Sequence, residues 1–392
     1  MYNFEFSMPT KVIFGSGEVV RIGEEAAGFG KKAMLLTYDE DFVSSIGLLS
    51  KVEKSCASSG VNLVKCFGVK SNPTVEHAIP IIEIAKKEKP DAIIALGGGS
   101  VVDEAKFIGI SAKYDGFCWD LATGKAPILD SIPVIAVVTI PATSSELNGT
   151  SVMTYEQGRR KEGFVSPLMR PKTAILDPEL TYSIPIKQTA YSAADIVSHL
   201  MEAYLGHTLD WAPFQDYYCH GGMRTIIECM EKLMIDPEDS EARAQMMWCA
   251  SYAWNGFYPC GLGPCDATIH ILGHSISNFY DTPHGAAMSV TIPATIKYFM
   301  DTKTKRLAEF ARGVFGIQEK DDKSAAKAGL TAIIAWFDKI GVPVTLKEAG
   351  ITDSEAIEKM VPDAMITAQA WGNDDLYSLD ILKKMFELCL ER

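Results

Sequence analysis

AIIALGGGSVVDE, residues 92–104, has the order of a buried strand, a tight turn and the start of a helix. Five apolar residues come first, three glycines follow, and the next residues are compatible with a helix. Glycines let the backbone approach a phosphate closely, and the N-terminus of a helix offers free N–H groups and partial positive charge. The segment predicts a phosphate cradle, with a simple strand-to-helix turn as the alternative.

Apolar runs and helical stretches alternate on both sides of this segment. The runs are KAMLLTYD, NLVKCFG, DAIIALGGGS and IPVIAVVTIP, and we expect helices near 46–59, 74–88 and 101–112. This rhythm predicts parallel βαβ units with helices on both faces of the sheet. A hairpin and a further strand are expected between 153 and 177, and the β-type runs stop after Pro185. We predict an α/β, Rossmann-like dinucleotide-binding domain over residues 1–185.

The rest of the chain has apolar residues at three- and four-residue spacing, which is the pattern of amphipathic helices. Examples are the stretches 187–205, 212–234, 239–256 and 323–340. A chain of 392 residues is also long for a single hydrophobic core. We therefore predict a second, all-helical domain over residues 186–392.

Charge and composition restrict the class of partner. The chain has 50 acidic and 37 basic side chains, and its net charge of -13 disfavours binding to nucleic acid or to an anionic membrane. We see no export signal and no apolar stretch of the roughly 18 residues that span a bilayer. The nine cysteines include no Cys-x-x-Cys pair, so we interpret them as reduced thiols. These features predict a cytoplasmic protein with a small-molecule partner.

A second loop, TIPATSSE at 139–146, carries four hydroxyl groups at the end of a predicted strand. They belong to Thr139, Thr143, Ser144 and Ser145. Hydroxyl groups and loop amides suit a pyrophosphate or a ribose. An ordinary capped helix start is the alternative, because Ser and Thr are common N-cap residues.

Asp39 follows the predicted strand KAMLLTY. Dinucleotide enzymes place an acid at this point to accept hydrogen bonds from the adenosine ribose. A carboxylate there repels a 2′-phosphate, so Asp39 favours NAD over NADP. The usual G-x-G-x-x-G opening is absent from the chain.

Two pairs of potential metal ligands have helical spacing. His270 and His274 are four residues apart, and His284 follows a proline that should end their helix and turn the chain back. Asp195 and His199 are also one helical turn apart. A carboxylate with several imidazoles suits Fe(II) or Zn(II). Core histidines and a buried salt bridge are the alternatives.

Glu202 lies on the same helix face as Asp195. It could support a metal ligand, but we interpret it as a solvated helix residue. His77, His207 and His220 lack such neighbours in the sequence and are interpreted as surface or core residues.

Together these motifs resemble the iron-containing (type III) alcohol dehydrogenases. The resemblance rests on F-x-F-x-x-P-T-K-V-I-F-G near the N-terminus, GGGS-x-x-D, TSSE, Asp-x-x-x-His and H-x-x-x-H…P-H-G-A-A, in that order between residues 4 and 300. The segments FCWDLATGK and ATSSELNGTSVMT are similar to the butanol dehydrogenase-like branch. The resemblance implies a dehydroquinate synthase-like architecture, in which a Rossmann-like domain precedes a helical domain, and a homodimer.

The resemblance also implies roles for individual residues. The metal ligands would be Asp195, His199, His270 and His284, and His274 would lie beside the nicotinamide and the substrate. The complete predicted cofactor-binding set is Asp39, Asn72, Gly97, Gly98, Gly99, Ser100, Asp103, Thr139, Thr143, Ser145 and Lys161. One departure is Ser144, because the family has glycine at this point of its T-G-S-E motif. Relatives that use NADP carry glycine where Asp39 stands, which supports NAD here.

The predicted reaction is hydride transfer between NAD(H) and small primary alcohols or aldehydes. A bound Fe2+ or Zn2+ would act as a Lewis acid on the alcohol oxygen, and His274 would pass the proton outward. The sequence around the ligands, WNGFYPCGLGPCDATIHILGH, has no Lys or Arg, so a phosphorylated or polyanionic substrate is not expected. The alternatives are another reaction on the same fold, such as glycerol dehydrogenase, lactaldehyde reductase or dehydroquinate synthase, and a sensor that binds NAD and metal without turnover.

Overall fold

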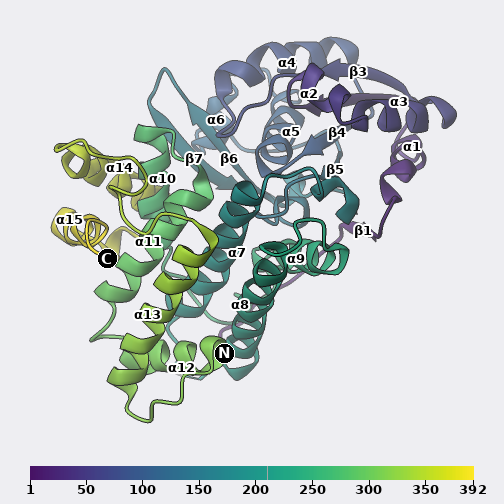
Figure 1. The fold of residues 1–392 in the computed structure, drawn as a ribbon. Coiled ribbons are helices and arrows are strands. Elements are labelled where there is room, and N and C mark those ends of the chain that lie inside the picture. Colours follow the sequence, from purple (N-terminus) through teal and green to yellow (C-terminus); the bar gives the residue numbers. More distant parts are fainter. Residues whose placement is uncertain (210) are drawn as a thin grey trace. The chain divides into compact units, whose positions relative to one another are not determined.

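The computed structural model describes residues 1–209 and 211–392, and these form two compact units (Figure 1). The α/β unit comprises Ser7–Ile184 and Ala250–Asn255, and the helical unit comprises Met1–Phe6, Pro185–Cys249 and Gly256–Arg392. Two short segments thus belong to a different unit from the one expected for them.

Hydrogen bonds explain why these two segments belong to the other unit. The Tyr2 N–H donates a hydrogen bond of 2.9 Å to the carbonyl of Gly261, so the N-terminal segment joins the helical unit. Residues 250–255 join the α/β unit because the Ser144 hydroxyl donates to the Ala250 carbonyl and accepts a 2.8 Å hydrogen bond from the Trp254 N–H.

Within the described part of the chain, the α/β unit has a parallel sheet of six strands. Their order is β1 (Lys11–Phe14), β8 (Thr173–Leu176), β5 (Val134–Val138), β4 (Ala92–Gly97), β2 (Lys32–Thr37) and β3 (Asn62–Cys66). The predicted fold class, α/β followed by helical, is confirmed. Strand β1 was not among the expected strands, because four residues at a sheet edge are too few for a clear pattern.

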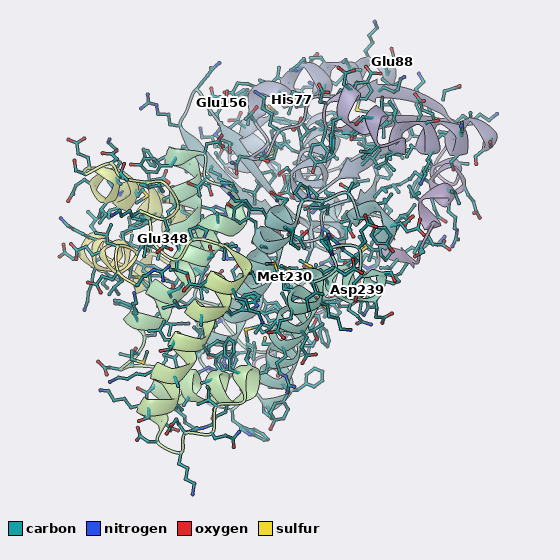
Figure 2. All side chains as sticks on the ribbon, in the orientation of Figure 1. His77, Glu88, Glu156, Met230, Asp239 and Glu348 are labelled. Carbon is teal, nitrogen blue, oxygen red and sulfur yellow. The ribbon has the colours of Figure 1, made fainter. Side chains whose placement is uncertain are left out.

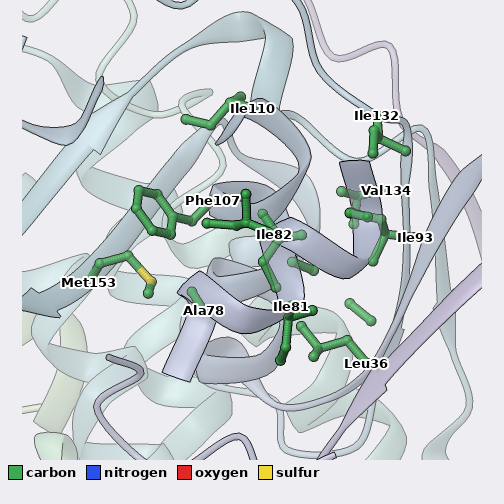
Figure 3. Packing of buried hydrophobic residues seen from close by; sticks show 14 of the residues in the cluster. Leu36, Ala78, Ile81, Ile82, Ile93, Phe107, Ile110, Ile132, Val134 and Met153 are labelled. Carbon is green, nitrogen blue, oxygen red and sulfur yellow. The ribbon is translucent and has the colours of Figure 1, made fainter. Parts of the chain in front are cut away.

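Side chains of the central strands alternate between two hydrophobic clusters, one on each face of the sheet. Met34 and Leu36 belong to one cluster, whereas Leu35 belongs to the other. The first cluster is covered by α4 (Val75–Glu88), α5 (Gly99–Ser111) and α6 (Trp119–Ala122), and the second by α1 (Ile22–Ala27), α2 (Glu40–Ser45) and α3 (Leu48–Ser58). Figure 3 shows the first cluster, in which strand residues Leu36, Ile93 and Val134 lie with Ile81, Ile82 and Phe107 of the covering helices. Burial on both faces explains why these strands are almost entirely apolar.

A separate antiparallel hairpin follows the sheet strand β5. It consists of β6 (Thr150–Tyr155) and β7 (Arg160–Val165), and Met153 of β6 enters the first hydrophobic cluster. The hairpin is therefore anchored to the same core as α5, which carries the predicted phosphate cradle at its start.

The helical unit is built from successive α-helices. They are α7 (Ile186–Gly206), α8 (Pro213–Leu233), α9 (Ser240–Ala253), α10 (Thr268–Tyr280), α11 (His284–Tyr298), α12 (Thr304–Phe315), α13 (Asp322–Ile340), α14 (Ala356–Ala370) and α15 (Leu379–Leu388), and the last four residues of α9 belong to the α/β unit. Helix α10 is followed by its C-cap residue Asp281, which has a left-handed φ of 47°. Pro283 then precedes α11, so His284 is its first residue. No helix in the described residues is long and apolar enough to cross a membrane.

Candidate functional site

Three helices of the helical unit bring a carboxylate and three imidazoles together. Asp195 and His199 lie one turn apart on α7, His270 is on the first turn of α10, and His284 begins α11. One potential ligand atom from each of Asp195, His199 and His270 lies within 4.8 Å of the others. The Asp195 carboxylate is 3.4 Å from Nε2 of His284. The four predicted metal ligands therefore form one cluster.

The electrostatics of this cluster suit a cation. Asp195 is only 3% exposed, and His199 and His270 are also buried. Burial, and after it the neighbouring His270, hold the pKa of His199 well below its usual range. A neutral imidazole keeps a lone pair for a metal, and one carboxylate with neutral imidazoles is a donor set for Fe(II) or Zn(II). The residues present fit a divalent metal ion.

Glu202 is not the solvated residue expected from the sequence. It is 2% exposed, and its carboxylate accepts hydrogen bonds from the ring Nδ1 and from the backbone N–H of His270, the latter at 3.2 Å. The helix face that Glu202 shares with Asp195 does not point to water, because α10 packs against it. The shared face was the available clue to this role.

His274 lies one turn after His270 and is buried. Its ring centroid is 5.6 Å from that of His284 and 5.0 Å from that of Trp371, which meets it edge to face. The predicted catalytic histidine is therefore adjacent to the metal-ligand cluster. Trp371, at the end of α14, is a neighbour that no motif had indicated.

The glycine turn of the α/β unit depends on the absence of side chains. A Cβ at Gly97 would collide with Val101, and one at Gly99 would collide with Thr143. Gly98 precedes the first residue of α5, and its N–H donates a 2.8 Å hydrogen bond to the Tyr38 hydroxyl. The turn thus brings the start of α5 close to the hydroxyl-rich loop 139–146.

Asp103 and Ser145, two predicted cofactor ligands, bind each other. The Ser145 hydroxyl donates to Asp103 Oδ1 at 2.5 Å and accepts from Lys106 Nζ at 2.7 Å. The other Asp103 oxygen accepts the Val152 N–H at 3.0 Å. These polar groups therefore connect α5, the loop and the hairpin.

Lys106 is a site residue that the sequence analysis missed. Its side chain is fully buried, and Nζ also donates to Asn148 Oδ1 at 3.1 Å and to the Thr150 carbonyl at 2.6 Å. Burial lowers its pKa to about 8, against the opposing effects of Asp103 and Glu146. A lysine within the apolar helix EAKFIGI was the clue that could have revealed it.

The remaining hydroxyl-bearing residues of the second loop also make hydrogen bonds. The Thr139 N–H donates to the Gly97 carbonyl at 3.0 Å, and Thr143 Oγ1 accepts the Ser145 N–H at 3.2 Å. Ser144, which replaces the family's glycine, is buried and has a φ of 52°, a left-handed conformation that suits glycine. Its hydroxyl turns away from the loop to bond residues 250 and 254.

Asp39 caps a helix. Its Oδ1 accepts the N–H groups of Asp41 at 3.0 Å and Phe42 at 3.3 Å at the start of α2. The side chain is exposed just after the end of β2, and both hydrogen bonds to α2 use Oδ1. Capping and ribose binding are therefore compatible.

Asn72 and Lys161, both predicted cofactor ligands, are paired. Lys161 Nζ donates a 2.8 Å hydrogen bond to Asn72 Oδ1, although the residues are far apart in the chain. Nearby in sequence, His77 lies on α4, where Figure 2 labels it. Its Nδ1 is 2.5 Å from the carboxylate of the buried Glu104, and its Nε2 is 3.0 Å from the Phe67 carbonyl. The hydrogen bond with Glu104 raises the pKa of His77. This histidine therefore anchors one end of the loop that carries Asn72.

Family models match most of the chain. A model described as iron-containing alcohol dehydrogenase matches residues 9–178, and one described as the C-terminal part of the Fe-containing alcohol dehydrogenase family matches residues 189–387.

Individual relatives are similar over nearly their whole lengths. A probable NADH-dependent butanol dehydrogenase 1 of Bacillus subtilis (strain 168) is 35% identical and covers 97% of this chain and 98% of its own. The NADPH-dependent aldehyde reductase YqhD of Escherichia coli (strain K12) is 32% identical, with 99% of each chain covered. The crystal structure of NADH-dependent butanol dehydrogenase A from Thermotoga maritima superposes with a TM-score of 0.95 at 34% identity and covers 100% of this chain and 99% of that one.

The predicted resemblance is therefore confirmed. An alcohol dehydrogenase of this family uses a nicotinamide cofactor and a metal, and the fold agrees with that description. The chain belongs to the iron-containing alcohol dehydrogenase family.

Proposed function

We propose that this alcohol dehydrogenase transfers a hydride between NAD(H) and small primary alcohols or aldehydes, with butanol-like substrates. The proposed metal is Fe2+, and Zn2+ is the alternative. Its ligands are Asp195, His199, His270 and His284. The observation that carries this proposal is the cluster of one buried carboxylate and three imidazoles beside His274.

Residues around the cluster have separable roles. When bound, a divalent cation supplies Lewis acidity at this position. Asp195 contributes negative charge to the ligand set. His274 is proposed to accept the proton that leaves the alcohol hydroxyl. The Trp371 ring contacts the His274 ring in an edge-to-face arrangement and is proposed to limit the access of water to the imidazole.

The coenzyme is proposed to bind the α/β unit, and the metal and substrate the helical unit, with the boundary near residue 185. The turn Gly97–Ser100 offers the start of α5 to phosphate, and Thr139 and Thr143 adjoin it. Lys161 and Asn72 form a polar pair for the ribose or nicotinamide. Asp103 and Ser145 hold these elements together, and one lone pair of the Ser145 hydroxyl stays available.

NAD is proposed over NADP because Asp39 is an exposed carboxylate at the end of β2. The relatives themselves are named for different coenzymes, NADH in one case and NADPH in another. The role of Asp39 in the choice between NAD and NADP must therefore be tested in this chain.

We propose a small uncharged substrate, because no Lys or Arg that could bind an anionic group occurs between residues 256 and 274, around His270. We further propose a cytoplasmic homodimer. Light scattering of the purified protein measures its molar mass and so tests the dimer. Fractionation of cells shows which compartment contains the protein.

The function is tested by NADH oxidation at 340 nm with butyraldehyde. Protein purified without oxygen is assayed before and after chelation, and then after addition of Fe(II) or Zn(II). We expect turnover to disappear on chelation and to return with one of the two metals. Glycerol and lactaldehyde, assayed in parallel, report the alternative reactions on this fold.

A matched pair of variants locates the metal. His199→Ala should abolish metal retention and turnover, whereas His220→Ala removes a buried histidine of the same unit from outside the cluster and should leave metal content unchanged. Tight NADH binding without turnover under every condition would support the sensor instead. Equal metal content in both variants would contradict the ligand assignment.

A further inference from the structure

We propose that Glu202 is a positioning residue for the metal, because it fixes which nitrogen of His270 faces the other ligands. This inference rests on the metal site proposed above. Glu202 and His270 are 68 residues apart in the chain, and both are buried. The Glu202 carboxylate contacts two groups of His270, the ring Nδ1 and the backbone N–H.

The backbone contact satisfies an N–H group at the start of α10. His270 is the third residue of this helix, so its N–H has no partner within the helix. Ala267 occupies the N-cap position and has no side chain that can accept a hydrogen bond. Glu202 Oε1, on α7, accepts the His270 N–H at 3.2 Å and therefore caps α10 from a neighbouring helix.

The ring contact sets the proton position. A carboxylate can only accept hydrogen bonds, so the His270 ring must donate through Nδ1. The neutral ring then has its lone pair on Nε2, and the Nδ1 position is already occupied. Of the two neutral tautomers, only this one leaves Nε2 as a metal ligand.

Both contacts act together on the geometry of the cluster. The backbone bond fixes the first turn of α10, and the ring bond fixes the rotation of the imidazole about its side-chain torsions. Asp195 and His199 lie on the same helix as Glu202, so the carboxylate that orients His270 moves with two of the other ligands. One side chain thereby couples the ligands of α7 to the ligand of α10.

Charge balance gives Glu202 a second effect. A divalent ion with Asp195 and three neutral imidazoles would leave one unbalanced positive charge in a buried site. The nearby Glu202 carboxylate balances it through the His270 ring, and a ring that donates to a carboxylate is a more basic ligand. Removal of this charge should therefore weaken metal binding even where the side-chain shape is kept.

The test is the affinity of the full-length protein for Zn(II), measured by competition with a chromophoric chelator at constant pH. Glu202→Gln keeps the shape but removes the charge, and its amide cannot accept both hydrogen bonds in the same arrangement. We expect it to bind Zn(II) about 10- to 100-fold more weakly than the unmodified protein. Glu202→Asp retains the charge with a shorter reach, and a smaller loss is expected.

Asp266→Asn is the matched control. Asp266 also caps the start of α10, because its Oδ1 accepts the Thr268 N–H at 3.1 Å, but it does not bond a histidine ring. Asp266→Asn should reduce thermal stability while its Zn(II) affinity stays within about twofold of the unmodified value, because the His270 ring keeps its partner.

A spectroscopic measurement gives an independent readout on the Zn(II)-loaded protein. With 15N-labelled histidine, the His270 Nδ1–H proton should resonate far downfield in the unmodified protein and move upfield in Glu202→Gln. Unchanged Zn(II) affinity in Glu202→Gln, or equal losses in Glu202→Gln and Asp266→Asn, would overturn the proposal. If the unmodified protein and His199→Ala bind Zn(II) equally, the metal site itself is wrong, and both proposals fail.

Discussion

Replacement of Asp39 by glycine should shift the coenzyme preference from NADH toward NADPH. Asp39 is exposed at the carboxyl end of β2, and one of its oxygens caps α2. Glycine at an N-cap costs only a few tenths of a kcal/mol relative to aspartate. The substitution therefore removes the charge and the ribose acceptor with little loss of helix stability.

The expected magnitude follows from two effects at this position. In water, two unit charges about 5 Å apart interact by roughly 0.8 kcal/mol, so a 2′-phosphate with a charge near −1.5 to −2 is repelled by about 1.2–1.7 kcal/mol. A ribose hydroxyl bonded to the carboxylate contributes about 1.5–3 kcal/mol in favour of NADH. Loss of both effects should change the NADPH-to-NADH ratio of kcat/KM by about two to three orders of magnitude.

The assay measures kcat/KM for each coenzyme with saturating butyraldehyde at two salt concentrations. Asp41→Asn is the control, because it removes an equal exposed charge from the same helical turn. The repulsive part of the effect should shrink at high salt. An unchanged ratio in Asp39→Gly, or an equal change in Asp41→Asn, would refute the assignment of Asp39 to the adenosine ribose.

Three further predictions concern buried polar groups of the α/β unit. Ser144→Ala should lower the unfolding free energy by about 1–3 kcal/mol, because two backbone groups lose their hydrogen-bond partner. Ser144→Gly should lower it less, because glycine adopts the left-handed φ without strain. Urea unfolding measures both values, and a lower stability for the glycine variant than for the alanine variant would contradict this order. Lys106→Met should lower the unfolding free energy by about 3–5 kcal/mol, because it breaks a buried network around a charged group. It should also weaken NADH binding. Urea unfolding and NADH fluorescence measure the two effects, and unchanged NADH affinity in a folded variant would show that the network does not position the coenzyme loop. The hydrogen bond with Glu104 raises the pKa of His77, and burial raises that of Glu104, so the stability from this pair is present at low pH and is lost as pH rises through the folded-state pKa values. The stability advantage over a variant with glutamine at both positions should therefore shrink as pH rises above the ordinary histidine pKa of about 6.5, and a growing advantage would contradict this sign.

The pattern of apolar residues was sufficient to predict the fold class. Strands buried on both faces must be apolar throughout, and helices that cover them must be amphipathic, so the class of each long element follows from local periodicity. The short edge strand β1 and the exchanged segments 1–6 and 250–255 could not be predicted, because contacts far along the chain determine their place.

In the candidate site, too, some features follow from local sequence pattern and others depend on contacts between distant residues. Helical spacing alone placed Asp195 with His199 and His270 with His274, because residues four apart share a helix face. Whether a neighbouring polar residue is exposed or buried does not follow from spacing. Glu202 was therefore interpreted incorrectly, and Lys106 was missed.

Local pattern and recognisable motifs in the sequence were enough for the fold class, the long strands and helices of the first domain, the family and the candidate metal ligands. Only the tertiary structure decided which polar groups satisfy one another: Glu202 with His270, Asp103 with Ser145 and Lys106, and Lys161 with Asn72. The physical reason is that a buried polar group must find a partner, and packing of distant elements decides which partner is within reach.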